Sequence, residues 1–284
     1  MAVTSRIVQI SDNHLSARHG YSRSNWEATV AHIGALAPDL VISTGDMVID
    51  DPDEADTRAF ARERFDRLPC PWLVVPGNHD VGDGPPTPWQ DQPVTAERVE
   101  AFVDTWGMDR FVHDIDGWRL VGINGLLLGS GLDALEQNQD EWLEDTLAGA
   151  DGRRLAIFAH KPFYTERPDE PDTIMNVPIA ARARVLRQLE RHGVELIATG
   201  HLHDARVRHA AGAAHVWCPT SAFLLMDQPT DPFGGVPQVG LIEYDFDPDG
   251  VSWRTRSPAG VAAFSLADVG RQHGAVRFAP EHPW

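Results

Sequence analysis

VELIATGHLH, at residues 194–203, joins a short apolar run to a glycine and two histidines. Runs of about four to eight residues rich in Val, Ile and Leu, bounded by turn-forming residues, are typical of buried β-strands. Four similar runs lie upstream, each followed by a polar cluster: RIVQI (6–10), DLVIS (39–43), WLVV (72–75) and RLAIFA (154–159). The repetition predicts an architecture in which each buried strand ends where polar side chains begin.

Helical patterns separate these strands. The expected helices are residues 24–37 with Ser24 as N-cap, 54–67, 139–148, and 178–191, with Pro178 in the first turn and Gly193 just beyond the end. Alternating strands and helices predict a layered α/β fold. Residues 110–128 and 205–256 show turn signals but few helix starts, and we expect them to add antiparallel strands. The Pro- and Gly-rich segment 81–93 is expected to be an irregular loop, either a tolerant surface loop or one that shapes the substrate site.

Composition narrows the class of protein. With 42% hydrophobic and 23% charged residues, the 284-residue chain can bury the core of one large α/β domain or two small ones. Its 24 basic and 42 acidic residues give a formal charge of −18, which disfavours a nucleic acid polymer as partner. Only two cysteines occur, so no disulfide framework is expected. The chain start lacks a signal-peptide pattern and no apolar stretch approaches the roughly 18 residues that span a bilayer, so we expect a cytoplasmic protein without a membrane partner.

The polar clusters carry residue types that bind metals. They supply Asp12, His14, Asp46, Asn78, His79, His160, His201 and His203. Each alone has an ordinary structural explanation, such as a turn or a helix cap. In open α/β sheets, however, ligands bind beyond the carboxyl ends of the strands, so these side chains are expected to meet at one edge.

The number and type of these residues indicate the kind of site. They are too many for one catalytic ion, which keeps open positions, and suit two ions about 3.5–4 Å apart that share one carboxylate. Imidazole and oxygen ligands without cysteine favour Mn, Fe, Zn or Co. The pairs Asp12/His14 and His201/His203 are each two residues apart, and we expect them to project to one side of an extended chain. The glycines expected to let the backbone approach the metals are Gly45, Gly77 and Gly200.

In this order the clusters resemble a known family. SDNH (11–14), TGDM (44–47), PGNHD (76–80), AHKP (159–162) and TGHLH (199–203) match the D-x-H, G-D, G-N-H-D/E, H and G-H-x-H pattern of the calcineurin-like binuclear metallophosphoesterases. The resemblance spans residues 12–203 and implies a four-layer α/β/β/α sandwich of two mixed sheets flanked by helices. We expect this metallophosphoesterase domain to cover residues 1–256. Residues 257–284 are expected to form a C-terminal extension that caps the domain or makes a contact in a homo-oligomer.

The resemblance also implies a role for each position. Asp12, His14 and His203 are expected to hold the first metal ion, Asn78, His160 and His201 the second, and Asp46 to bridge both. His79 is implied to be the catalytic histidine, which contacts phosphate or protonates the leaving oxygen. Asp80 is expected to orient His79, with a turn-forming role as the alternative. Asn78 is also expected to contact the substrate.

One departure concerns substrate binding. SDNHL, TGDMVID and PGNHD most resemble the bacterial cyclic-nucleotide phosphodiesterase and glycerophosphodiesterase branch, whose members commonly have HHP where this chain has AHKP. Lys161 therefore replaces a second histidine, and either binds a phosphate oxygen or lies at the rim as a solvated cation. Tyr164 is a candidate for stacking on a nucleobase, with packing as the alternative.

The expected activity is hydrolysis of a small phosphodiester, of the cyclic-nucleotide or glycerophosphodiester type, by attack of a hydroxide held between the two ions. One alternative is a phosphomonoesterase of broad specificity, which must hold a dianion and needs extra cations. The candidate cations near the motifs are only Arg18, Arg23, Lys161 and Arg167, which favours diesters. A non-catalytic, metal-stabilised scaffold is the alternative from another class, and it would be expected to have lost ligands.

Overall fold

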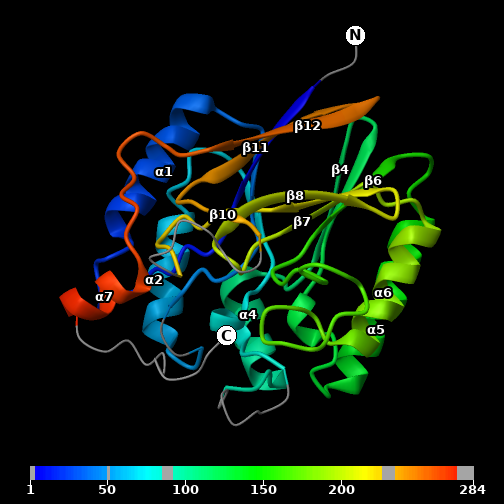
Figure 1. Cartoon of the computed structure of the whole chain (residues 1–284), viewed down its shortest axis with the longest axis horizontal. Coiled ribbons are helices and arrows are strands. Elements are labelled where there is room, and N and C mark those ends of the chain that lie inside the picture. Colours follow the sequence, from blue (N-terminus) through cyan, green and yellow to red (C-terminus); the bar gives the residue numbers. More distant parts are fainter. Residues whose placement is uncertain (1–3, 50–51, 85–91, 226–233, 274–284) are drawn as a thin grey trace.

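The computed structural model describes residues 4–49, 52–84, 92–225 and 234–273. Two mixed β-sheets face each other, with helices on their outer sides (Figure 1). The first sheet has the strand order β12-β11-β1-β2-β3. Its strands are β1 (Ser5–Ile10), β2 (Leu40–Ser43) and β3 (Trp72–Val74), which run parallel, and β11 (Leu241–Asp247) and β12 (Gly250–Arg256), which are added antiparallel.

The second sheet has the order β10-β8-β9-β7-β6-β5-β4. Its parallel centre comprises β5 (Trp118–Gly122), β6 (Arg154–Phe158), β7 (Leu196–Thr199) and β9 (Ala213–Trp217). The antiparallel strands at its two sides are β4 (Phe111–Ile115), β8 (Asp204–Ala210) and β10 (Val236–Pro237). The five predicted buried strands are all present. The antiparallel strands expected within 110–128 and 205–256 are confirmed for β4, β8, β10, β11 and β12. The expectation is wrong for β5 and β9, which belong to the parallel centre of the second sheet.

Alternation along the strands builds the layers. In β6, Phe158 points into the core between the sheets, whereas Ile157 points outward beneath the helices. The helices over the first sheet are α1 (Arg23–Leu36), α2 (Ala55–Phe65) and α4 (Ala96–Trp106); those over the second are α5 (Asp133–Ala148) and α6 (Ile179–Arg191). Side chains with a period of two line opposite faces of a strand, and the central strands β2, β6 and β7 are buried on both faces. The outer strand β12 instead alternates half-buried and exposed side chains. The predicted α/β/β/α sandwich is confirmed.

Helix ends differ from the predictions in places. Ser24 lies inside α1 and is not its N-cap; Ser22 precedes the helix and its hydroxyl donates to the His14 carbonyl oxygen at 2.9 Å. The segment 139–148 is the second half of α5. Helix α4 was not predicted, although the Thr95 hydroxyl accepts a hydrogen bond from the backbone N–H of Arg98 at its start. A single turn, α3 (Asn78–Val81), follows β3, and a 3₁₀ turn, η1, covers Gly125–Leu127.

The described part of the C-terminal segment packs against the domain. The Asn25 side chain forms two hydrogen bonds with the backbone of Ala262, at 2.9 and 2.8 Å. Helix α7 (Leu266–His273) follows (Figure 1), and Val269 is buried beside Tyr21 and Phe223. The boundary at residue 256 and a role in capping or oligomer contact stay predictions, and residues 274–284 lie outside the described residues. So do residues 85–91 of the predicted loop 81–93.

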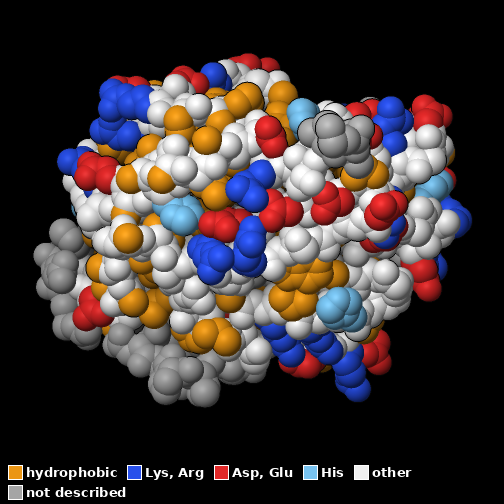
Figure 2. Space-filling view, turned by 90° about the horizontal axis from the view of Figure 1, so that it is seen from above, with side chains coloured by type: hydrophobic (Ala, Val, Ile, Leu, Met, Phe, Trp, Pro, Cys, Tyr) orange, Lys and Arg blue, Asp and Glu red, His pale blue; other side chains and the backbone are white. Residues whose placement is uncertain are grey.

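The surface carries charges of both signs. On the face shown in Figure 2, basic and acidic side chains lie beside one another instead of forming one continuous basic area. Strands β11 and β12 carry ion pairs such as Arg254–Asp245, whose charged atoms are 2.7 Å apart. Within the described ranges, no helix has the length and apolar character needed to cross a membrane.

Candidate metal centre

The seven predicted ligands gather where the strands end. Asp12 and His14 follow β1, Asp46 follows β2, Asn78 begins α3 after β3, His160 follows β6, and His201 and His203 follow β7. Three groups have ligand atoms that all lie within 4.8 Å of one another. Asp12, His14 and His203 form the first, and Asp46, His160 and His201 form the second. A third group, of His14, Asp46 and His79, shares one residue with each of them. The loops of both sheets thus meet in one two-part cluster.

The backbone at these residues is left-handed, so the prediction of extended chain for the two pairs is wrong. Asp12, His14, Asp46, His201 and His203 have φ of 53°, 45°, 53°, 72° and 58°. This region costs non-glycine residues free energy and persists where surrounding contacts impose it, commonly at functional sites. The N–H of Asp12 donates to the Gly45 carbonyl at 3.0 Å and that of His14 to the Asp46 carbonyl at 2.9 Å, so the two loops hold each other in this form.

Two glycines allow the loops to pack this closely. A Cβ added at Gly77 would lie 2.2 Å from Oδ1 and 2.3 Å from the backbone nitrogen of Asp46. A Cβ at Gly200 would lie 1.8 Å from the Ser11 hydroxyl. Glycine is therefore required at both positions for loop-to-loop packing, whereas its expected role in the approach of the backbone to the metals stays a prediction.

The first group contains polar atoms with no hydrogen-bond partner. Nε2 of His14 lies 3.0 Å from Nε2 of His203, which is 3.4 Å from Oδ1 of Asp12. Among the described residues, Oδ1 of Asp12 and Nδ1 of His14 are buried without a hydrogen-bond partner. Unpaired buried polar atoms are costly, and a bound cation would remove that cost for the carboxylate.

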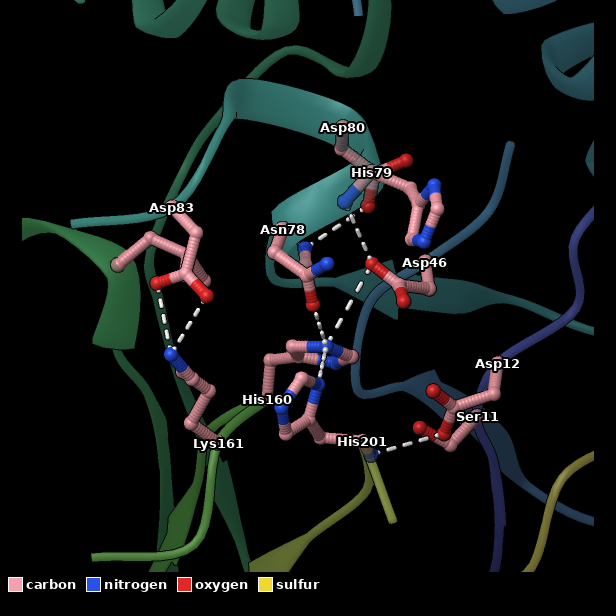
Figure 3. Close-up of polar contacts among 12 residues, drawn as sticks. Ser11, Asp12, Asp46, Asn78, His79, Asp80, Asp83, His160, Lys161 and His201 are labelled. Atoms are coloured by element: carbon pink, nitrogen blue, oxygen red, sulfur yellow. Dashed lines mark hydrogen bonds and ion pairs between the residues drawn. The ribbon is translucent and has the colours of Figure 1, made fainter. Parts of the chain in front are cut away.

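The second group surrounds the ring of His160 (Figure 3). Nε2 of His160 lies 2.9 Å from Oδ1 of Asn78, 3.1 Å from Nδ1 of His201 and 3.4 Å from Oδ1 of Asp46. Four ligand atoms from four separate loops therefore converge on one point.

Asp46 lies between the two groups. Its Oδ1 faces His160, whereas its Oδ2 is 3.7 Å from Nε2 of His14. The backbone N–H of His79 donates to Oδ1 at 2.8 Å and fixes the orientation of the carboxylate. One buried carboxylate thus presents one oxygen to each group, which is the geometry needed to share two ions.

Backbone carbonyls orient three of the histidines. Nδ1 of His160 is 2.7 Å from the Thr44 oxygen and Nε2 of His201 is 3.0 Å from the Ile174 oxygen. Nδ1 of His203 similarly contacts the Phe223 oxygen. A carbonyl can only accept, so these partners assign the proton to that nitrogen and leave the lone pair of the other nitrogen for the centre.

Burial controls the charge of the cluster. It lowers the pKa of His160 and lowers that of His14 and His201 well below the usual value, so these imidazoles are neutral near pH 7. Burial raises the pKa of Asp46 well above its usual range, and the nearby Asp12 raises it further. Burial is the largest single influence on Asp12 and acts to raise its pKa, but His203, His160 and His14 together outweigh burial and lower the pKa. Neutral imidazoles and crowded carboxylates without enough donors fit metal ions.

The structure places His79 beside the first group. Its ring meets the His14 ring edge-on, with centroids 5.0 Å apart, and its Nδ1 lies 3.1 Å from the Ile49 carbonyl oxygen. Burial lowers the pKa of His79 to about 4, although the Ile49 hydrogen bond acts in the opposite direction. The free imidazole is therefore neutral near pH 7.

The role of Asp80 in orienting His79 stays a prediction, because the described contacts of the Asp80 carboxylate are with backbone N–H groups. The Asp80 carboxylate accepts backbone N–H bonds from Gly77 at 2.8 Å, Met47 at 3.1 Å and Val48 at 3.3 Å. Burial raises its pKa to about 7, against the lowering effect of these bonds. Asp80 therefore connects α3 to the loop that follows Asp46. These contacts favour the alternative role, in which Asp80 stabilises the turn.

Two predicted substrate-binding residues are buried in other contacts. Lys161 is 4% exposed and its Nζ lies 2.7 Å from both carboxylate oxygens of Asp83, so its description as a solvated rim cation is wrong. Tyr164 packs in the outer core of the second sheet, where its hydroxyl is 3.4 Å from Nε2 of His215. The described contacts of Tyr164 support packing, because its ring lies under α6 instead of among the metal-group residues.

Sequence reasoning missed several residues that shape the centre. The Phe223 ring stacks on His14 at 5.0 Å, and its carbonyl orients His203. The carbonyls of Thr44 and Ile174 orient two further histidines. Backbone carbonyls leave no trace in residue type, and Phe223 lies in SAFLL, which has no motif.

Comparison with known sequences gives relatives of two activities. A "Serine/threonine-protein phosphatase CPPED1" from Mus musculus is 33% identical over 147 residues, covering 50% of this chain and 43% of that protein. The chain thus spans less than half the length of that relative. A probable cyclic nucleotide phosphodiesterase from Synechococcus sp. is 26% identical over 266 residues, covering 90% of this chain and 92% of that protein. A 3',5'-cyclic adenosine monophosphate phosphodiesterase, CpdA of Escherichia coli, is 30% identical over 164 residues, covering 55% and 54%.

Solved structures agree on the fold. A dimetal phosphatase from Danio rerio superposes with a TM-score of 0.60 at 15% identity, covering 90% of this chain and 96% of that chain. A purple acid phosphatase from yellow lupin gives a TM-score of 0.61 at 13% identity, covering 95% and 55%. The model of the calcineurin-like phosphoesterase family matches residues 5–205, and the protein therefore belongs to that family.

Proposed function

We propose that this chain is a two-metal phosphoesterase that hydrolyses a small phosphodiester, of the cyclic-nucleotide or glycerophosphodiester type. The observation that carries the proposal is Asp46, whose two oxygens face two separate groups of candidate ligands. The first ion is assigned to Asp12, His14, Asp46 and His203, and the second to Asp46, Asn78, His160 and His201. When bound, two ions of the Mn, Fe, Zn or Co type supply Lewis acidity that activates water and offsets charge on phosphate oxygens.

The chain's own residues then hold the phosphate and move a proton. Asn78 begins α3 beside the second group, and we assign its amide the role of contacting a phosphate oxygen. His79 is neutral in the free protein because of burial. An anionic phosphate raises the pKa of a neighbouring imidazole, since it favours the charged form. We assign His79 the role of contacting the phosphate and protonating the leaving oxygen.

The pairing of nearby cations supports a diester over a monoester. Lys161 pairs with Asp83, Arg18 with Glu54 at 2.6 Å, and Arg167 with Asp169 at 3.5 Å. A monoester is a dianion near neutral pH, so it gains more than a monoanionic diester from unpaired cations. Three of the four candidate cations already have a carboxylate partner, and the fourth, Arg23, is exposed. The relatives named as cyclic nucleotide phosphodiesterases support the same choice.

A phosphomonoesterase of broad specificity is the second candidate. It is favoured by the 33% identity to a relative named as a serine/threonine-protein phosphatase. A non-catalytic scaffold is not favoured, because every ligand position is filled and the ligand atoms converge. We further propose that the partner is a small phosphate ester and not a nucleic acid polymer, given the charge of −18.

A substrate comparison on Mn-loaded protein tests the proposal. Turnover of a bis-aryl phosphate diester and its matching monoester would be measured first, then that of cyclic nucleotides and glycerophosphodiesters. We expect kcat/KM to be at least about tenfold higher for the diester, a difference of about 1.4 kcal/mol in transition-state binding. Preferred turnover of the monoester would reverse the ranking. Metal analysis provides the check against a scaffold, since fewer than about two ions at saturation is incompatible with the two-metal site.

A further inference from the structure

A buried ion pair lies beside the second group of ligands. Nζ of Lys161 is 2.7 Å from Oδ1 and 2.7 Å from Oδ2 of Asp83 (Figure 3). Lys161 is 4% exposed and Asp83 is 6% exposed. The ammonium and the carboxylate therefore neutralise each other out of contact with bulk water.

The pair connects the two chain segments that carry ligands for the second ion. Lys161 directly follows His160. Asp83 follows Gly82, whose N–H closes the single turn of α3 by donating to the Asn78 carbonyl at 2.9 Å. The ion pair thus joins the segment of His160 to the segment of Asn78.

The other described contact between these two ligands cannot hold them in place. Oδ1 of Asn78 and Nε2 of His160 are 2.9 Å apart. The Thr44 carbonyl assigns the imidazole proton to Nδ1, so both facing atoms are acceptors and repel in the absence of a cation. A metal ion must also enter between Asn78 and His160. Lys161 and Asp83 leave that space open, because they lie to one side of it (Figure 3).

We propose that Lys161 and Asp83 form a positioning pair for the second metal ion. The pair holds Asn78 and His160 at the separation that an ion requires, and Asp83 cancels a positive charge that would otherwise repel that ion. It follows that Lys161 is not the anchor for the substrate phosphate. This inference rests on the proposed two-metal function.

The test is calorimetric titration of the metal-free 284-residue chain with MnCl₂, in the wild type and in Asp83→Asn. Removal of the Asp83 carboxylate breaks the ion pair with Lys161 and leaves an unpaired ammonium beside the second site. We expect the affinity of the second ion to fall by about 10- to 100-fold, as for other residues that orient metal ligands, with the first ion unaffected. The KM for the diester at saturating Mn²⁺ is expected to stay within about twofold. Lys161→Arg keeps the charge pairing and should retain most of the second-ion affinity.

A matched control is Asp114→Asn, which removes the carboxylate of another two-contact pair, with Arg119 at 2.8 Å, between β4 and β5. It should leave both metal affinities unchanged. If Asp83→Asn fails to fold by circular dichroism, the double variant Lys161→Met/Asp83→Leu removes both charges, and it should still show the weakened second site.

Two results would overturn the positioning pair. One is an unchanged Mn²⁺ isotherm together with a lower KM, because a freed Lys161 would then be binding substrate phosphate. The other is an unchanged isotherm and an unchanged KM. Failure of the proposed function is distinguishable, since the wild type itself would then bind fewer than two ions or would not hydrolyse the diester.

Discussion

Glu170 offers a quantitative test of how the loop after β6 is held. Its carboxylate accepts hydrogen bonds from the N–H groups of Thr165 at 2.6 Å, Glu166 at 2.7 Å and Arg167 at 3.0 Å, and from the Asn176 amide at 2.8 Å. Burial acts to raise the pKa of Glu170, but these bonds outweigh it and lower the pKa from 4.5 to about 2. The same loop carries the Ile174 carbonyl that orients a candidate metal ligand.

The magnitude follows from linkage between the pKa and folding. Lowering the pKa of Glu170 from 4.5 to about 2 corresponds to at most about 3.4 kcal/mol of stability at neutral pH. Solvent screening near the surface reduces this to about 1–3 kcal/mol. Because the folded pKa is the lower one, this stability is present above about pH 4.5 and is lost as the pH falls toward 2. Glu170→Gln should therefore be about 1–3 kcal/mol less stable than wild type at pH 7, with a smaller difference at pH 3.

The assay is urea unfolding of both proteins between pH 7 and pH 3. The difference between the two free energies of unfolding at each pH removes the contribution of the other carboxylates, because they titrate in both proteins. Asp169→Asn is the control in the same loop, because its exposed pair with Arg167 should contribute less than about 1 kcal/mol. A Glu170→Gln difference that stays constant from pH 7 to pH 3 would refute the linkage argument.

Three further predictions concern the metal centre and its surroundings. Asp46→Ala should lower kcat at least about a hundredfold, because it removes the carboxylate shared by both groups, whereas His19→Ala should stay within about twofold; equal losses in a steady-state assay would contradict the bridging role. Gly77→Ala should lower the free energy of unfolding by about 1–3 kcal/mol, since its Cβ meets the Asp46 backbone. Gly34→Ala, in open helix with its nearest heavy atom at 3.8 Å, should not destabilise, and denaturant unfolding of both variants checks this. Tyr164→Phe should leave the KM for the diester unchanged and cost at most about 1 kcal/mol of stability; a raised KM would restore its role in substrate binding.

The fold could be predicted largely from local patterns. Apolar runs such as RIVQI and RLAIFA identified buried strands, because a strand covered on both faces has few positions for polar side chains. Helix α4 was missed because its residues follow a Pro- and Gly-rich stretch that indicates irregular structure. The N-cap of α1 was misplaced because the Ser22 hydroxyl bonds to the distant His14 carbonyl, a contact that local sequence does not encode.

The sequence by itself determined which residues could bind metals and that strand ends would bring them together, since residue type and strand position are both local properties. Only the tertiary structure decided how they are used. It placed Asp46 between the two groups, turned Asp80 toward backbone N–H groups, paired Lys161 with Asp83, and buried Tyr164 under α6. Each of these outcomes depends on loops that are distant in the chain and meet in space, so side-chain partners follow from the packing of the two sheets and not from the spacing of the motifs.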